Sequence, residues 1–118
     1  MTLHEVAAKI DLDLERTFAL FMGKEDMYVK YLRKFPDNAR RLLIELEEAV
    51  KSENHEKIEA AAHGIKGVAA NLGIRRVTEF GTALMLDIRE NTTEKIKDHY
   101  PKLVEEAEKA ISCIEELE

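Results

Sequence analysis

The side chains with the clearest chemical potential lie in the segment His63-Gly64-Ile65-Lys66-Gly67. At about 100° per residue, a helix through this segment places an apolar stripe on one side and His63 roughly 150° from the centre of that stripe. The stripe comprises Ile58, Ala61, Ala62, Ile65, Ala69 and Leu72. Lys66 and Gly67 follow His63 by three and four residues, so they share its face. The spacing predicts a solvent-facing imidazole with a cation and bare backbone beside it.

Each of these three residues has a definite chemical use. An unprotonated imidazole has a nucleophilic nitrogen near neutral pH. An ammonium group one turn away can neutralise an oxyanion attached to that nitrogen. Gly67 leaves room for an approaching partner, although a glycine inside a helix costs about 1 kcal/mol relative to alanine. The alternative interpretation of His63 is an ordinary surface histidine on a solvated helix face.

The twelve residues Ala62-His63-Gly64-Ile65-Lys66-Gly67-Val68-Ala69-Ala70-Asn71-Leu72-Gly73 resemble the signature of histidine-containing phosphotransfer (HPt) domains, the phosphorelay modules of two-component signalling. The specific part is the His-x-x-Lys-Gly core, and the flanking helices extend the resemblance to nearly the whole chain. Gly64 departs from the serine or threonine that is common in the family. The resemblance implies that His63 accepts a phosphoryl group on Nε2 from a receiver-domain aspartate and passes it to another receiver.

The resemblance has further implications for the site and its partners. Lys66 would neutralise the phosphoryl charge, and Gly67 would give a docking receiver clearance. The chain has no glycine-rich loop for ATP, so we expect a phosphocarrier rather than an enzyme. We expect no cofactor in this chain, with Mg²⁺ supplied by the receiver. Response-regulator receivers, and a hybrid histidine kinase, are the partners that the resemblance suggests.

Two other functions remain open at this point. A weaker resemblance is to the phosphotransfer domain of chemotaxis-type kinases. A protein-interaction bundle without phosphoryl chemistry would account for the helices and the acidity. It would leave the glycines Gly64 and Gly67 around an exposed histidine unexplained.

Composition predicts one all-α domain spanning residues 1–118. Hydrophobic residues make up 45% of the 118, with only 5 glycines and 2 prolines, which favours long regular elements. The formal net charge of −6 argues against a nucleic-acid partner, which would need a basic face. The single cysteine, Cys113, cannot form an internal disulfide, which favours a reducing compartment. Since no leader or membrane-spanning run is evident, we expect a cytoplasmic protein with no membrane partner.

Apolar periodicity predicts two short leading helices followed by four long amphipathic ones. The expected ranges are 2–9, 11–22, 25–51, 54–72, 75–90 and about 96–117. Long amphipathic helices with short connections predict an antiparallel up-down four-helix bundle, with one or two short extra N-terminal helices. Pro36 interrupts the helix over 25–51, and we expect it to bend that helix; splitting it in two is the alternative.

Local signals refine the helix ends. Ser52 or Asn54 is expected to cap the helix that carries His63, and Gly73 to terminate it in a left-handed conformation. The run Asn91-Thr92-Thr93-Glu94 resembles a capping box with asparagine in the cap position. Pro101 predicts a bend or a late start in the last helix. Asn71 is interpreted as structural, like Gly73.

Other candidate sites carry less weight. His55, Glu59 and His63 suit zinc or iron in ligand type. The two histidines are about 12 Å apart along a helix axis, too far to share one ion. Glu59 could favour the charged form of His63, but we interpret it as solvating the helix face. Cys113 is interpreted as packing.

One apolar residue lies off its helix stripe. Leu20 points away from the stripe formed by Leu14, Phe18 and Phe21. We interpret it as an isolated surface residue, which is common in soluble proteins. Its alternative interpretation is as part of a docking patch.

Overall fold

All the regular elements of the chain are helices in this computed structural model, which describes residues 1–118. The elements in order are α1 (Leu3–Ile10), α2 (Leu14–Leu20), α3 (Glu25–Leu32), α4 (Phe35–Lys51), α5 (His55–Asn71), α6 (Arg75–Arg89), the 3₁₀ turn η1 (Thr93–Lys95) and α7 (Ile96–Glu115). The only β-type pairing is an isolated bridge between Leu12 and Ile74. None of the helices combines the length and the apolar character needed to cross a bilayer.

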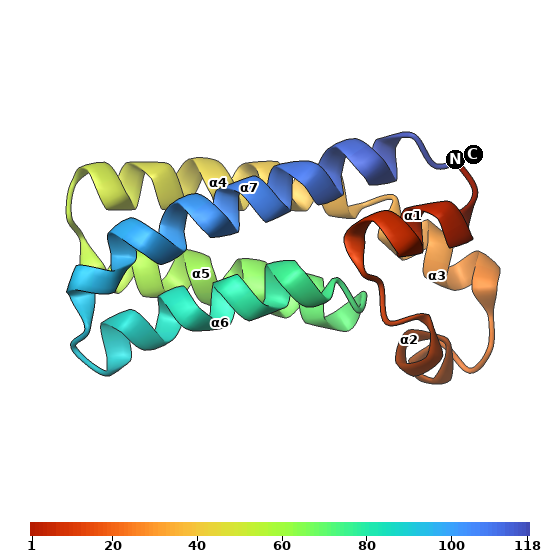
Figure 1. The fold of residues 1–118 in the computed structure, drawn as a ribbon, viewed down its shortest axis with the longest axis horizontal. Coiled ribbons are helices and arrows are strands. Elements are labelled where there is room, and N and C mark those ends of the chain that lie inside the picture. Colours follow the sequence, from red (N-terminus) through yellow and green to blue (C-terminus); the bar gives the residue numbers. More distant parts are fainter.

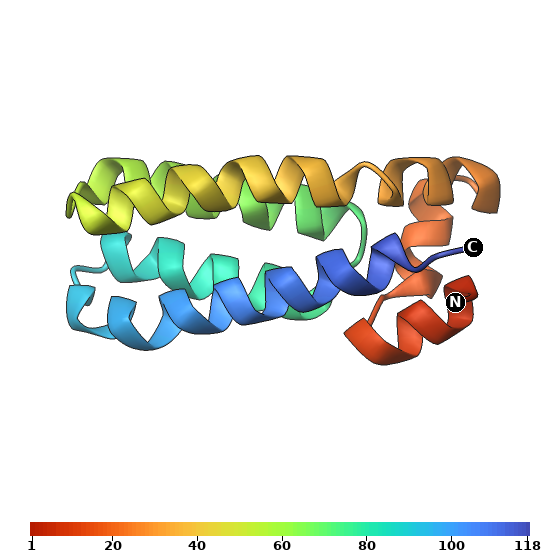
Figure 2. The same ribbon diagram turned by 90° about the horizontal axis from the view of Figure 1, so that it is seen from above.

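The molecule measures 40 × 23 × 19 Å along its three principal axes. The four long helices α4 to α7 run alternately up and down its long axis (Figures 1 and 2). The most extensive helix contact is between α5 and α6, followed by α4 with α5 and α6 with α7. A further contact between α4 and α7 closes the ring. The predicted antiparallel four-helix bundle is therefore confirmed, and α1 to α3 lie together at one end of it (Figure 1).

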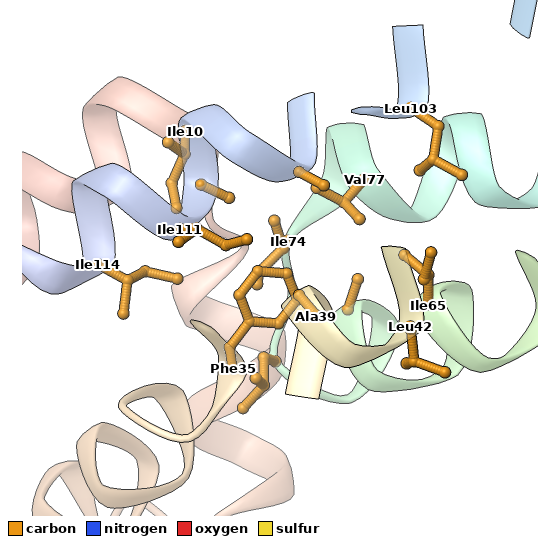
Figure 3. Close-up of a cluster of buried hydrophobic side chains, with 14 of the residues drawn as sticks. Ile10, Phe35, Ala39, Leu42, Ile65, Ile74, Val77, Leu103, Ile111 and Ile114 are labelled. Atoms are coloured by element: carbon orange, nitrogen blue, oxygen red, sulfur yellow. The ribbon is translucent and has the colours of Figure 1, made fainter. Parts of the chain in front are cut away.

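One continuous cluster of buried apolar side chains fills the bundle and extends under α1 and α3. Figure 3 shows part of it, where Phe35 of α4, Ile74 and Val77 at the start of α6, and Ile111 of α7 converge. The predicted α5 stripe is buried at every position, namely Ile58, Ala61, Ala62, Ile65, Ala69 and Leu72. Burial of this stripe fixes how α5 is rotated about its own axis.

Residues 25–51 form two helices, α3 and α4. The prediction of one bent helix is therefore wrong, and the alternative of two separate helices is confirmed. Arg33 and Lys34 separate the two helices. Pro36 lies in the first turn of α4, where its missing N–H leaves no helical bond unmade. Three short helices therefore precede the bundle, rather than the one or two predicted.

The starts of α5 and α7 agree only in part with the predictions from the sequence. Asn54 caps α5 as predicted, since its side chain accepts a hydrogen bond from the Lys57 N–H at 3.1 Å. The capping box at Asn91 is wrong, because Asn91 has a positive φ of 56° and the chain makes a 3₁₀ turn before α7 begins. Pro101 lies inside α7, which begins at Ile96, so the last helix does not start late.

Gly73 terminates the helix that carries His63, as predicted. Its φ of 71° lies in the left-handed region, which glycine adopts without steric cost. The Ile74 N–H donates to the Ala69 carbonyl at 3.0 Å, and the Gly73 N–H donates to the Ala70 carbonyl at 3.2 Å. These two bonds satisfy carbonyls that the end of α5 would otherwise leave free.

The N-terminal helices hold this turn from outside the bundle. The Asp13 N–H donates to the Gly73 carbonyl at 2.8 Å, and the buried Tyr28 hydroxyl donates to the Leu72 carbonyl at 2.7 Å. Burial raises the pKa of Tyr28 to about 12. The turn between α5 and α6 is therefore bound on two sides by α1 to α3.

Replacing Gly73 by alanine is expected to destabilise the fold by about 1–3 kcal/mol. A Cβ there would lie 2.5 Å from Thr17 Cγ2 and 3.0 Å from the Asp13 carbonyl oxygen, on a backbone with positive φ. Gly64→Ala is the matched control, because its Cβ would meet only the flexible end of Leu42, at 3.0 Å. We expect that variant to be neutral or up to about 1 kcal/mol more stable. Urea unfolding measures both, and a Gly73→Ala variant as stable as the wild type would contradict this account.

Candidate functional site

His63 lies on the solvent-facing side of α5 and is exposed, as predicted. The α5 stripe faces α4 and α6, and the helical period turns His63 away from it. Of the four histidines, only His99 makes a hydrogen bond within the chain, to Asp87. Both ring nitrogens of His63 are therefore free of intramolecular partners, and the imidazole can react with a group from outside.

Lys66 lies one turn further along α5 and is half-buried. Its Cα and Cβ lie against α6 at Gly81. The ammonium group takes part in none of the ion pairs of the chain, whereas Lys51 and Lys102 pair with glutamates on their own helices. The Lys66 ammonium group therefore has no carboxylate partner within the chain.

Three glycines inside helices α5 and α6 have different surroundings. A Cβ at Gly64 would meet Leu42 of α4, and a Cβ at Gly81 would meet Lys66, each at 3.0 Å. A Cβ at Gly67 would meet nothing within 4 Å. Backbone contact with α5 accounts for the glycine at Gly81, whereas Gly64 faces only the movable end of the Leu42 side chain. Neither kind of contact accounts for Gly67, which lies one turn above His63.

Glu59 is held by an arginine, which differs from the expectation that it only solvates the helix face. Arg89, near the end of α6, donates from Nε to the Glu59 carboxylate. Glu59 lies one turn before His63, so this pair places a neutralised carboxylate next to the imidazole. No group of three or more His, Cys, Asp or Glu side chains is arranged to hold a metal ion.

The remaining candidate residues lie away from this site. His99 Nδ1 is 2.6 Å from the buried Asp87 carboxylate, where α6, η1 and α7 meet. Cys113 is buried, and burial raises the pKa of its thiol. A raised pKa leaves less of the reactive thiolate at neutral pH, in agreement with the interpretation of Cys113 as packing.

An exposed apolar surface covers the α2–α3 connection. Its members are exposed by 59% (Leu20), 83% (Met22), 43% (Met27) and 46% (Tyr31), and they line one hollow together with Phe21. We call these five residues the α2–α3 patch. Leu20 is therefore not isolated, which corrects its interpretation from the sequence. Two methionines and a leucine gathered around Gly23 were the sequence signal that could have revealed the patch.

The α2–α3 patch continues onto α5. A second hollow is lined by Leu20, Phe21 and Tyr31 of the patch together with Val68 and Asn71 of α5. Asn71 is exposed and lies one turn beyond Gly67, which itself lies one turn beyond His63. Its side chain makes no hydrogen bond at the helix end, so the shaping of that end falls to Gly73. One face of the molecule therefore carries His63, Gly67, Asn71 and the patch.

Comparison with known proteins adds one finding. The family model described as the Hpt domain matches residues 30–116, which span α4 to α7 and the end of α3. No match was found among curated proteins or among solved structures. Most of the α2–α3 patch precedes the matched region.

Proposed function

Because this chain belongs to the Hpt domain family, whose members carry phosphoryl groups in two-component phosphorelays, we propose that His63 is its phosphoacceptor. The phosphoryl group comes from an aspartyl phosphate on a receiver domain and passes to the aspartate of another receiver. The observation that carries this proposal is the exposed imidazole of His63, free of intramolecular hydrogen bonds, at the histidine of the family motif. A plain interaction bundle would give that arrangement no use.

The transfer itself requires little from this domain. Unprotonated Nε2 attacks the phosphorus, the N–P bond forms, and the P–O bond to the aspartate breaks, so that the aspartate leaves as a carboxylate. Phosphoryl transfer depends mainly on positioning and charge neutralisation. The receiver brings the Mg²⁺ and the acidic pocket, and this chain brings a rigid nucleophile. Members of the Hpt family are phosphocarriers without an ATP site of their own, and we propose the same of this chain.

Charge at the site favours the phosphorylated form. A phosphoryl group adds a charge of roughly −2 at pH 7. Lys66 is the nearest cation along the helix and has no carboxylate partner, so it is available to this charge. Glu59 would repel the phosphoryl group, but its pairing with Arg89 offsets that repulsion.

The surroundings of Gly67 support a partner that approaches closely. Glycine in a helix interior costs about 1 kcal/mol relative to alanine, and nothing inside the chain requires it at this position. A receiver whose backbone passes over α5 beside His63 would require it. The adjoining α2–α3 patch offers the apolar surface that such docking needs.

His63→Gln is expected to abolish phosphoryl uptake from a receiver domain that has been phosphorylated with labelled acetyl phosphate. The unfolding free energy should change by no more than about 0.5 kcal/mol, because the side chain is exposed and unbonded. His55→Gln, an exposed histidine on the same helix, is the matched control and should be labelled like the wild type. The label should be acid-labile, as a phosphoramidate is. Labelling of the His63→Gln variant would refute the assignment.

Gly67→Gln is expected to weaken receiver binding at least tenfold, since the longer side chain occupies the proposed approach path. The same change should leave the fold intact or stabilise it by up to about 1 kcal/mol, because glutamine is a better helix former. Gly67→Ala gives the intermediate member of the series. Calorimetric titration with a receiver domain measures binding, and undiminished affinity of the glutamine variant would exclude the clearance role.

Leu20→Glu is expected to weaken receiver binding by placing a charge in the α2–α3 patch. The matched control is Ile44→Glu on α4, because Ile44 is 60% exposed and Leu20 is 59% exposed. Ile44 lines a groove between α4 and α7 and does not border the hollows of the patch. Equal losses of affinity from the two variants would show that the patch has no special part in docking.

A further inference from the structure

Gly81 permits a close approach between the backbones of α6 and α5. A Cβ at Gly81 would lie 3.0 Å from Lys66 Cβ, 3.3 Å from Lys66 Cα and 3.4 Å from Lys66 N. Two of these atoms belong to the α5 backbone, so they cannot move away without moving the helix. Gly81 is buried on α6 between Val77 and Leu84, and it has no positive φ that would require glycine. Close packing against Lys66 is the physical reason for glycine at this position.

This contact places α6 directly against the first carbon of the Lys66 side chain. Because the first carbon of the side chain rests against α6, α6 limits the directions that the rest of the side chain can take. No ion pair holds the ammonium group at its other end. The position of the cation beside His63 therefore depends on how close α6 lies to α5, the most extensive helix pair of the bundle.

Gly64 also lies against a neighbouring helix, but it contacts a side chain there and not the backbone. Gly64 faces the Leu42 side chain, whose terminal carbon can rotate away, and it lies on the α4 side of α5. Only Gly81 meets the backbone of a residue in the candidate site.

We propose that Gly81 is a positioning residue for phosphoryl transfer, which sets the place of the Lys66 ammonium beside His63 by letting α6 lie directly against the Lys66 backbone. The proposal rests on the proposed function of His63 and Lys66. Gly81 itself touches no phosphoryl group. Its effect on transfer passes through Lys66.

A double-mutant cycle tests this coupling. Gly81→Ala is made in the wild type and in the Lys66→Ala variant, which keeps the N, Cα and Cβ atoms that the new methyl group meets. Any effect on folding is therefore the same in both backgrounds, while only the wild type has an ammonium group to displace. Labelled phosphoryl uptake, the half-life of the phosphohistidine and the urea unfolding of all four proteins are measured.

In the wild-type background, Gly81→Ala should slow uptake and shorten the phosphohistidine half-life several-fold. In the Lys66→Ala background it should change neither. Equal effects in the two backgrounds, or no effect in the wild type, would overturn the role of Gly81. If the wild type itself takes up no label on His63, the proposed function fails first, and the role of Gly81 fails with it.

A second measurement needs no substitution at Gly81. In the unmodified protein, proton NMR should show contacts between the Lys66 β-protons and the Gly81 α-protons. It should also show the rest of the Lys66 side chain restricted on the α6 side. A Lys66 side chain that is free of α6 would contradict the proposal even if the Gly81→Ala variant failed to fold.

Discussion

Burial of a single stripe on α5 is the constraint on which the site depends. Each fully buried Ile or Leu of the stripe contributes about 1.5–3 kcal/mol, and the stripe includes Ile58, Ile65 and Leu72. Rotating α5 by one residue, about 100°, would bring part of this stripe into water. The exposed direction of His63 is therefore set by the packing energy of other residues. The imidazole contributes no contact of its own.

The residues of the site add little to the stability of the fold, which agrees with a division between scaffold and function. His63 has no hydrogen-bond partner within the chain, and the Lys66 ammonium group forms no ion pair. Gly67 lowers the stability of its helix relative to alanine, and no contact within the chain requires a glycine there. The scaffold is well satisfied by contrast, since no buried side-chain polar atom lacks a hydrogen-bond partner. The N-terminal helices contribute both to the stability of the scaffold and to the surface around the candidate site. They bind the turn after α5, and they carry the apolar surface beside the site.

Electrostatics at the site differ from those of the chain as a whole. The formal net charge is −6, yet the carboxylate nearest His63 along the helix is paired with Arg89, and the nearest ammonium is free. Interactions between exposed charges are screened over about 8 Å at physiological ionic strength, so the local pair matters more than the distant acids. This local charge balance supports the proposal that an acidic protein accepts a phosphoryl dianion on His63.

Features that follow from helical periodicity and local backbone chemistry could be predicted from the amino-acid sequence alone. These include the four-helix bundle, the buried stripe of α5, the exposed His63 with Lys66 and Gly67 on its face, the Asn54 cap and the left-handed Gly73. The helices, their apolar stripes and their caps depend on residues within a few positions of one another, and the short connections between amphipathic helices predict the bundle. Features that depend on contact with a second, distant segment could be seen only in the folded chain. The tertiary structure split the helix around Pro36, joined Glu59 to Arg89 and gathered the α2–α3 patch next to α5. It also distinguished Gly67 from Gly64 and Gly81, because the space around a glycine depends on the helix that packs against it.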